Sequence, residues 1–372
     1  MNVLFSLNHP AHYHMFKHLV KMLNDDGHET QYVISNKDVL EDLLKSDGVP
    51  YIKLQQRRHR KSNALSVMIN GVVDMLEKDW LLLKHVRHHR PDIMLGTDIS
   101  IGHVGMLTHI PSLFFNEDDY EINKAACLLS YPFVSGVVSP DVCHAGSLFE
   151  RKKISYCSYQ KLAYIHPKYF SADYQLVRQY VGDADNYYFL RLVSLTAGHD
   201  ISGKHRGIDD NLLDSLINIL EPKGKVLISS ERALPEKYRK YQLSAPPACI
   251  HHLMQYATLL IADSQSMCFE AGLMGVPYIR FNDFVGKISV LNQVENDYQL
   301  GYGVRTTEAD RLLQLAKDLT EQSDIKEQWK QKRDRLLQDK IDANLFWKWL
   351  IEDYPNSKNI LKDNPDHQFN FR

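Results

Sequence analysis

A short run of polar residues in the second half of the chain has the composition of an anion-binding turn. Residues 259–262 (LLIA) are apolar and predict a buried strand, and a helix is expected over 266–274. The polar residues at this turn are Asp263, Ser264, Gln265 and Ser266. The first turn of a helix carries unpaired N–H groups and a partial positive charge, so this turn could hold a diphosphate.

The side chains around this turn allow more than one interpretation. Ser264 and Ser266 could donate hydrogen bonds to phosphate oxygens, or they could only cap an ordinary helix. Glu270, one helical turn further along, stands where a carboxylate could accept from a ribose diol. His251, in the preceding predicted helix, could face a ligand at this turn or lie exposed. The fingerprint GxGxxG is missing from the sequence, which disfavours a dinucleotide cofactor.

Arginines near predicted strand ends could complete an anion site. Ser230, Glu231 and Arg232 follow a predicted strand, so their side chains are expected at the carboxyl edge of its sheet. Arg232 could bind a diphosphate through two parallel hydrogen bonds, or it could form a surface salt bridge with Glu231. Arg191 and Arg280 lie in apolar strands and need partners if buried.

Acid–base chemistry is expected from the first half of the chain. The loop over 8–14 (NHPAHYH) follows the first predicted strand, and imidazole titrates near neutral pH. His12 is the first candidate for a base and His14 the second, unless both only cap and pack the helix start. Glu117, in the acidic cluster over 116–119, could serve as a base or bind hydroxyl groups, or could simply begin a helix.

Alternating strands and helices must position these residues. Strands are predicted over 1–7, 30–34, 51–54, 92–96, 112–116, 134–139, 153–156, 187–195, 225–229, 259–262 and 277–280. Amphipathic helical patterns separate most of them, and the longest is the helix over 64–89. This order predicts an α/β protein with parallel, doubly wound sheets.

The composition excludes several functional classes. The 372 residues include 44 basic and 46 acidic ones, a net charge of −2, which gives no electrostatic case for nucleic-acid binding. No signal peptide and no apolar run of about 20 residues is present. The five cysteines form no CxxC pair, as expected of a reduced, cytoplasmic protein. His14 and His18 share a helix face without a third ligand at a recognisable spacing, which disfavours a metal site.

The pattern D-S-x5-E-A-x3-G-x-P, which begins at Asp263, resembles the nucleotide-sugar motif of the GT-B fold. That motif is shared by UDP-N-acetylglucosamine 2-epimerases and many glycosyltransferases. More closely, the chain resembles the DUF354 family of GT-B-like proteins, often associated with surface-polysaccharide gene clusters. The matching segments are NHPAHYHMFKHL, KLAYIHPKYF, ISSERALP, IHHLMQYATLLIADSQSM and EAGLMGVPYIR. Where the epimerases have Gly-Gly after Asp-Ser, this chain has Gln265-Ser266.

The resemblance implies a GT-B-like fold of two Rossmann-like domains that face each other across a cleft. We expect an acceptor-side domain over 1–170 and a nucleotide-sugar-binding domain over 171–340. A helix over 341–355 is expected to pack back across the hinge, followed by a loose polar tail over 356–372. The interdomain connection is placed in 164–185, where no strand is predicted.

The function implied is that of a metal-independent glycosyltransferase with a nucleotide-sugar donor, most simply a UDP-sugar, in surface-polysaccharide or glycoconjugate biosynthesis. The alternatives are a hexosamine 2-epimerase and a non-catalytic nucleotide-sugar binder, because one fold serves several chemistries. The nucleotide-sugar is a substrate, and no further cofactor is expected. The acceptor would be a sugar or a lipid-linked sugar. An apolar face on the helix over 64–89 could contact the inner face of a membrane, or it could be buried in the fold.

Overall fold

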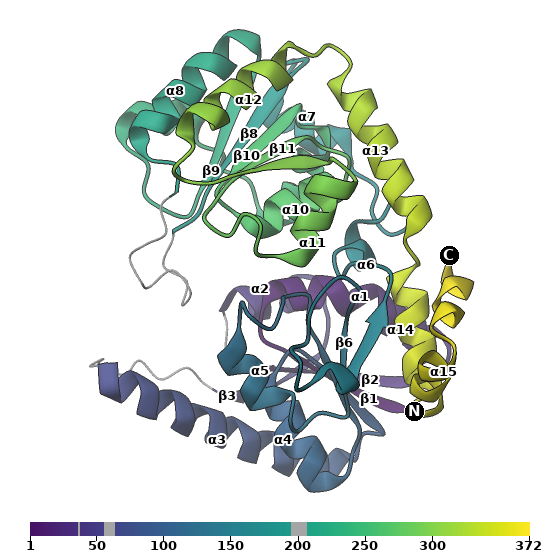
Figure 1. Cartoon of the computed structure of the whole chain (residues 1–372). Helices are drawn as coiled ribbons and strands as arrows, with labels where there is room; N and C mark the ends of the chain where they lie inside the picture. The colour runs from purple at the N-terminus through teal and green to yellow at the C-terminus, as the bar shows by residue number, and fades with distance from the viewer. Residues whose placement is uncertain (36–37, 56–63, 195–206) are drawn as a thin grey trace. The chain divides into compact units, whose positions relative to one another are not determined.

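Strands and helices alternate along the chain and form two separate parallel sheets. The computed structural model describes residues 1–35, 38–55, 64–194 and 207–372 (Figure 1). Its residues divide into unit 1, made of 1–164 and 340–372, and unit 2, made of 165–339. The sequence places this division at 170/171 and 340/341. No described helix is both long enough and apolar enough to cross a membrane.

Unit 1 contains a parallel sheet with the order β3-β2-β1-β4-β5-β6-β7 in its described residues. Its strands are β1 (Asn2–Leu7), β2 (Glu29–Ser35), β3 (Tyr51–Gln55), β4 (Ile93–Gly96), β5 (Ser112–Phe115), β6 (Gly136–Pro140) and β7 (Lys153–Tyr156). Its helices are α1 (Pro10–Asp25), α2 (Asp38–Ser46), α3 (Ala64–His89), α4 (Ile99–Thr108), α5 (Lys124–Ser130), η1 (Glu150–Lys152), α14 (Ala343–Glu352), α15 (Asn356–Asp363) and η6 (Pro365–Phe371), with α6 (Leu162–Ile165) at the boundary.

The central strand β1 is buried on both faces, as its nearly continuous apolar sequence predicts. Val3, Phe5 and Leu7 belong to one core cluster, which also contains residues of α1, α2 and α14. Leu4 belongs to a second cluster, with residues of α3, α4 and α5. Because side chains alternate along a strand, β1 therefore joins two cores, one on each side of the sheet.

The last part of the chain completes the first core. Trp347, on α14, is fully buried, and its ring centre lies 5.2 Å from that of Phe115 and 5.6 Å from that of Tyr156. The expectation of a loose tail over 356–372 is wrong. The tail forms α15 and η6, Phe371 packs against Phe346, and Gln368 accepts a hydrogen bond from the Cys157 N–H. Composition suggested a loose tail, but its few aromatic side chains suffice to anchor it.

Unit 2 contains a parallel sheet with the order β12-β11-β10-β8-β9 in the part that the structure describes. Its strands are β8 (Tyr187–Leu192), β9 (Lys225–Ser230), β10 (Leu259–Ala262), β11 (Tyr278–Phe281) and β12 (Gly301–Val304). Its helices are α7 (Tyr174–Val181), α8 (Asp210–Leu220), η2 (Glu221–Lys223), η3 (Glu236–Tyr241), η4 (Pro247–Cys249), α9 (Ile250–Tyr256), α10 (Gln265–Leu273), α11 (Ser289–Asn292), the π-helix η5 (Gln293–Asp297), α12 (Ala309–Glu321) and α13 (Ile325–Asp339).

A buried ion pair ties β11 to the π-helix η5. Arg280 is fully buried and donates from Nε and Nη2 to the two carboxylate oxygens of Glu295, at 2.8 and 2.9 Å. The Tyr278 hydroxyl donates to the same carboxylate at 3.2 Å. Glycine is required at Gly301 on the neighbouring strand β12, because a Cβ there would overlap the Tyr278 ring. Arg280 is therefore held by a structural pair through Nε and Nη2, while its buried Nη1 has no partner among the described residues.

Removal of the Trp347 side chain tests how much the C-terminal segment stabilises unit 1. Trp347→Ala should lower the free energy of unfolding by about 3–5 kcal/mol, because it leaves a cavity between the sheet and α14. The measurement is urea denaturation followed by circular dichroism. In the matched control Trp80→Ala, an exposed tryptophan is removed from α3, and the change should stay within about 0.5 kcal/mol. Equal losses in the two variants would contradict the packing described here.

Candidate functional site

The polar turn singled out in the sequence lies where the strand order of unit 2 reverses. Connections leave β8 towards β9 on one side, and β10 lies on its other side. In open parallel sheets, ligands bind at the carboxyl ends of the strands at such a point. Asp263 directly follows β10, and Val193 directly follows β8. The Val193 N–H donates to Asp263 Oδ1 at 2.7 Å, so this carboxylate joins the two strand ends.

Asp263 is a buried carboxyl group without an ion-pair partner in direct contact among the described residues. Its exposed fraction is 1 %, and burial raises its pKa to about 6. Hydrogen bonds from the backbone of Val193 and Ile208 and the positive charge of Arg232 act in the opposite direction. The second oxygen, Oδ2, has no hydrogen-bond partner among the described residues. A polar ligand at this edge would satisfy it.

The helix that follows Asp263 presents its first turn at the same edge of the sheet. Ser264 is the N-cap of α10, and its hydroxyl accepts from the Met267 N–H at 3.4 Å. Gln265 begins the helix, and Ser266 is exposed. The hydroxyl of Ser264 is therefore engaged in capping, whereas Ser266 is exposed. The N–H groups in the first turn of a helix that lack a partner suit an anion.

Glu270 and His251 form a pair one helical turn further along. Glu270 Oε2, on α10, lies 3.4 Å from His251 Nε2, on α9, and both side chains are largely buried. His252 has a different task, because its Nδ1 accepts the Asp173 N–H at 2.8 Å. Phe170 packs against both imidazole rings. The structure thus brings His251, Glu270 and the α10 turn into one group and assigns His252 to the support of unit 2.

The segment after β9 supplies one arginine to this edge, and its neighbour is used elsewhere. Ser230 Oγ donates to the Arg232 carbonyl and accepts the Arg232 N–H, which fixes a tight turn. A salt bridge between Arg232 and Glu231 was one prediction, and it is wrong. Glu231 pairs with Arg191 instead, and Arg191 also donates to Ser229. Arg191 is thus a structural residue, and Glu231 is available to a ligand only through its exposed side.

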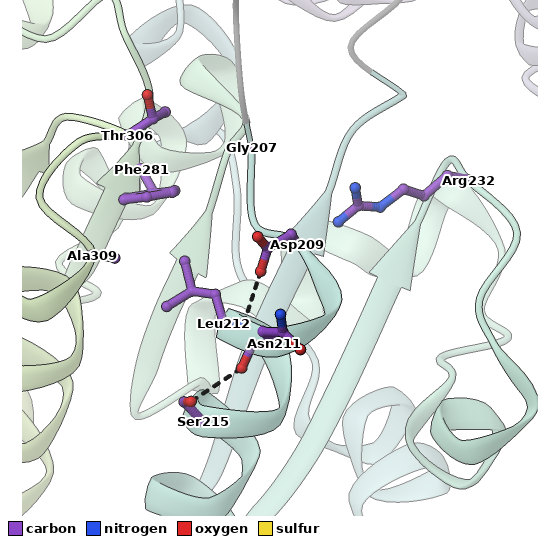
Figure 2. A pocket seen from close by; sticks show the side chains of 9 residues that line it. All are labelled: Gly207, Asp209, Asn211, Leu212, Ser215, Arg232, Phe281, Thr306 and Ala309. Carbon is purple, nitrogen blue, oxygen red and sulfur yellow. Dashed lines mark hydrogen bonds between the residues drawn. The ribbon is translucent and has the colours of Figure 1, made fainter.

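Arg232 borders a cavity of about 530 Å³ (Figure 2). Its guanidinium donates to the Ile208 carbonyl and acts electrostatically on Asp263, so the cavity and the α10 turn share one charge environment. The cavity is lined by Gly207, Asp209, Asn211, Leu212, Ser215, Arg232, Phe281, Thr306 and Ala309. Figure 2 shows Phe281 and Thr306 on one side of this space and Arg232 on the other. A cation, an aromatic ring and hydroxyl or amide groups are a suitable lining for a nucleotide fragment.

Sequence reasoning missed Phe281 and Thr306. Phe281 ends β11, and Thr306 lies just after β12, whose existence the sequence did not predict. Phe281 could have been predicted to line a site, because it directly follows Arg280 at the end of a predicted strand. For Thr306, a prediction of the short strand β12 would have been needed first.

Unit 1 has a polar group at the corresponding reversal of its strand order, between β1 and β4. His12 Nδ1 accepts the Asn8 N–H at 3.3 Å and lies 2.8 Å from Thr97 Oγ1. Because Nδ1 accepts, the Thr97 hydroxyl donates to it, and the neutral ring carries its proton on Nε2. His9, rather than His12, is the N-cap of α1. Thr97 is a functional candidate that the sequence reasoning overlooked, although it directly follows the strand that ends at Gly96.

A buried ion pair between Asp98 and Lys78 supports the polar group formed by Asn8, His12 and Thr97. Asp98 is buried, and burial alone would raise its pKa, but the charge and hydrogen bond of Lys78 hold the pKa below its usual value. The Lys78 ammonium also donates to Asn8 Oδ1 at 3.2 Å, and the Ser6 hydroxyl donates to Asp98. Gly96 permits the close approach, since a Cβ there would overlap the Ser6 carbonyl oxygen. Asp98 and Lys78 therefore position Asn8, which in turn contacts His12.

The other two acid–base candidates have structural partners. His14 is half-buried on α1, and its ring lies 5.7 Å from that of Tyr164. Glu117 is buried and accepts from the Gln160 N–H at 2.6 Å and from the Lys161 ammonium at 2.9 Å. The Glu117 carboxylate is therefore engaged in contacts within unit 1. Among the residues that the structure describes, no three His, Cys, Asp or Glu side chains gather to hold a metal ion.

Comparison with solved structures identifies the fold. The S. aureus protein MnaA in its complex with UDP is similar with a TM-score of 0.64 and 13 % identity, over 96 % of this chain and 97 % of that chain. The UDP-GlcNAc 2-epimerase of Methanocaldococcus jannaschii has a TM-score of 0.62 and 13 % identity, over 87 % of this chain and 94 % of that chain. A Streptomyces glycosyltransferase complexed with thymidine diphosphate has a TM-score of 0.59 and 14 % identity, over 95 % of this chain and 99 % of that chain. The fold is GT-B-like.

These similarities confirm the predicted fold class and its relation to glycosyltransferases and 2-epimerases, which share the GT-B-like arrangement of two α/β units. Identities of this size show the fold alone. No model of a protein family matches the chain, and no curated protein matches it. Membership of the DUF354 family stays a prediction from the sequence.

The buried carboxyl group of Asp263 makes a testable contribution to stability. Because its folded pKa of about 6 exceeds the unfolded value of 3.8, the native state binds more protons between these values. The free energy of unfolding should therefore fall by about 3 kcal/mol as the pH rises through this window and stay lower above it. Asp263→Asn removes this contribution, so the variant should gain stability relative to the wild type between about pH 4 and about pH 7.

Urea denaturation at the two pH values checks this expectation. Asp183→Asn is the matched control, because Asp183 is a largely exposed aspartate whose ion pair with Arg178 contributes little. A difference between Asp263→Asn and wild type that is the same at both pH values would show that Asp263 is not a buried, titrating group.

Proposed function

We propose that the protein is a glycosyltransferase whose unit 2 binds a nucleotide-sugar donor, most simply a UDP-sugar. The observation that carries this proposal is the unsatisfied Asp263 carboxyl at the reversal of the strand order, beside the first turn of α10. Native proteins leave few buried polar atoms without a partner, so an orphaned oxygen at a ligand-binding edge favours a polar ligand there. Solved proteins of the same fold hold UDP and thymidine diphosphate.

In this proposal, unit 2 divides the donor among three groups of residues. The first-turn N–H groups of α10, with Gln265 and Ser266, bind the diphosphate. Glu270 accepts hydrogen bonds from the ribose diol, and the neighbouring His251 holds its carboxylate in place. Arg232 neutralises the diphosphate from the side of the cavity.

Transfer then needs a group that removes a proton from the acceptor, which we assign to unit 1. The acceptor oxygen attacks the anomeric carbon, and the bond from that carbon to the diphosphate oxygen breaks with its electron pair. Thr97 takes the acceptor proton as it gives its own to His12 Nδ1, which lies 2.8 Å away. The charge left on the diphosphate is stabilised by the α10 N-terminus and Arg232.

Two further parts of the proposal rest on the sequence. The resemblance to DUF354 proteins supports a role in surface-polysaccharide or glycoconjugate biosynthesis. The proposed transfer needs only protein groups for proton removal and leaving-group stabilisation, so we propose that it proceeds without a metal ion.

A thermal-shift screen of the intact protein against nucleoside diphosphates and nucleotide-sugars tests the donor site. Ligands of unit 2 should raise the melting temperature with increasing concentration. With a donor identified, nucleoside diphosphate should be released only when an acceptor is supplied. If solvent deuterium is incorporated at carbon 2 of the sugar without any acceptor, the protein is an epimerase and the proposal of a glycosyltransferase is wrong. Binding without turnover under all these conditions would leave only a nucleotide-sugar binder.

Glu270→Gln tests the assignment of the ribose contact. The change keeps the size of the side chain and removes its charge, so the dissociation constant of the nucleotide should rise about 10- to 100-fold. Isothermal titration calorimetry measures this effect. Glu236→Gln is the matched control, since Glu236 is exposed in the same unit, pairs only with an exposed arginine in the described structure and should leave the affinity unchanged. Normal affinity in Glu270→Gln would refute the site.

His12→Gln and Thr97→Val test the proton relay separately from binding. Each should leave nucleotide affinity within about twofold of wild type and lower the turnover number about 10²- to 10⁴-fold. The measurement is diphosphate release with donor and acceptor both saturating. If Thr97→Val retains full turnover while His12→Gln does not, the proton reaches His12 directly and the relay is wrong.

A further inference from the structure

Three helices of unit 1 expose large apolar side chains. From residue 70 onwards, where its side chains are described, α3 presents Leu76 and Trp80, exposed by 58 % and 61 %. Among the described side chains, those of this kind on the three helices are Val72, Val73, Leu76, Trp80, Met106, Leu107, Leu128 and Leu129, which we call the apolar patch. These helices cover one face of the unit 1 sheet, next to the core cluster that contains Leu4. Exposed apolar groups in this number mark an interaction surface rather than isolated surface residues.

One histidine shows that these side chains come from a single region. His103, on α4, contacts Asp79 of α3 through Nδ1 at 2.7 Å and the Leu129 carbonyl of α5 through Nε2 at 2.8 Å. Most of the apolar patch lies within about one helical turn of these three residues. Trp80 is next to Asp79, and Met106 and Leu107 follow His103 by three and four positions, on the same side of α4. The apolar patch therefore lies on three neighbouring helices, α3, α4 and α5.

The carboxyl-terminal part of α3 is cationic. Lys84 lies 5.8 Å from the centre of the Trp80 ring, one helical turn beyond the apolar stripe. A shallow cavity of about 510 Å³ is lined by Leu81, Lys84, His85, Arg87, His88 and His89. Lys84 and Arg87 are exposed, and no ion pair engages either of them in the described part of the chain. Asp74 and Glu77 of the same helix lie toward its other end, so charge is graded along α3.

The chemistry of this surface matches an anionic lipid bilayer better than a protein partner. With 26 residues, α3 is about 39 Å long, long enough to lie along a membrane surface. Apolar side chains with a tryptophan on one side and lysine and arginine beyond them are the features of helices that lie in the interface plane. Lys84 and Arg87 would meet lipid phosphates, each adding to the attraction. We propose that unit 1 docks on an anionic membrane through the apolar patch and the cationic end of α3.

Vesicle co-sedimentation of the full chain tests this docking. The protein should bind vesicles of phosphatidylcholine with about 30 % phosphatidylglycerol more strongly than pure phosphatidylcholine, and less at about 0.5 M than at about 0.1 M salt. The double variant Leu76→Ser/Trp80→Ala should lower the partition coefficient at least about tenfold, because it removes apolar area from the interface. Lys84→Glu/Arg87→Glu should lower it at least about tenfold on anionic vesicles only.

Val39→Ser is the matched control. Val39 is an equally exposed apolar residue on α2, whose buried residues Leu40 and Leu44 belong to the core cluster on the other face of the sheet, so its removal should leave partitioning unchanged. Thermal unfolding of each variant checks that the fold is retained. Failure of the wild-type protein to bind either vesicle type would overturn the proposal. Light scattering provides a further test: a wild-type dimer that the Leu76→Ser/Trp80→Ala variant dissociates, without any vesicle binding, would assign the patch to a second copy of the chain. These readouts are independent of nucleotide binding.

Discussion

Each sheet buries one carboxyl group, Asp98 or Asp263, where its strand order reverses. Burying this charge costs free energy, and the groups that contact each carboxyl group offset that cost to different extents. Unit 1 offsets the cost with a cation, because Lys78 contacts Asp98 directly and holds its pKa low. Among the described residues of unit 2, no cation contacts Asp263 directly. Backbone N–H groups and the charge of Arg232 reduce this cost without removing it, so the pKa of Asp263 stays near 6. In the part of the chain that the structure describes, the buried carboxyl group therefore has a cation in direct contact in unit 1 and none in unit 2.

This difference separates the tasks of the two units in our proposal. In unit 1 the Asp98–Lys78 pair is a fixed support, and in our proposal the neighbouring His12 and Thr97 exchange protons. In unit 2 the unsatisfied group and the first turn of α10 lie together at the edge, where a ligand would complete them. In our proposal, unit 1 therefore holds the catalytic groups on a rigid support whose hydrogen bonds are satisfied. Unit 2 holds the binding groups, which a ligand would complete.

Local sequence patterns were sufficient for most strands and for the strand–turn–helix around Asp263, because both depend on residues that are adjacent in the sequence. The strand β12 escaped because Gly301 and Gly303, needed for close contact with Tyr278 and Glu295, are untypical of strands. The partners of Arg191, Arg280 and Glu117 come from 40, 15 and 43–44 positions away. No periodicity reports such pairings, so candidate ligand-binding groups could not be separated from structural ones. Thr97 was missed for the same reason, since only its contact with His12 distinguishes it.

The division of unit 1 into two stretches of sequence has a consequence for biosynthesis. Unit 2 is continuous, so it can fold once residue 339 has left the ribosome, whereas unit 1 still lacks α14 until residue 352 has followed. During that interval the aromatic surface formed by Phe16, Phe115 and Tyr156 has no Trp347 to cover it. During synthesis, unit 1 therefore exposes an aromatic surface at a stage when all residues of unit 2 have already been made. Chaperones that bind exposed aromatic surface would find their target in the unit that is synthesised first.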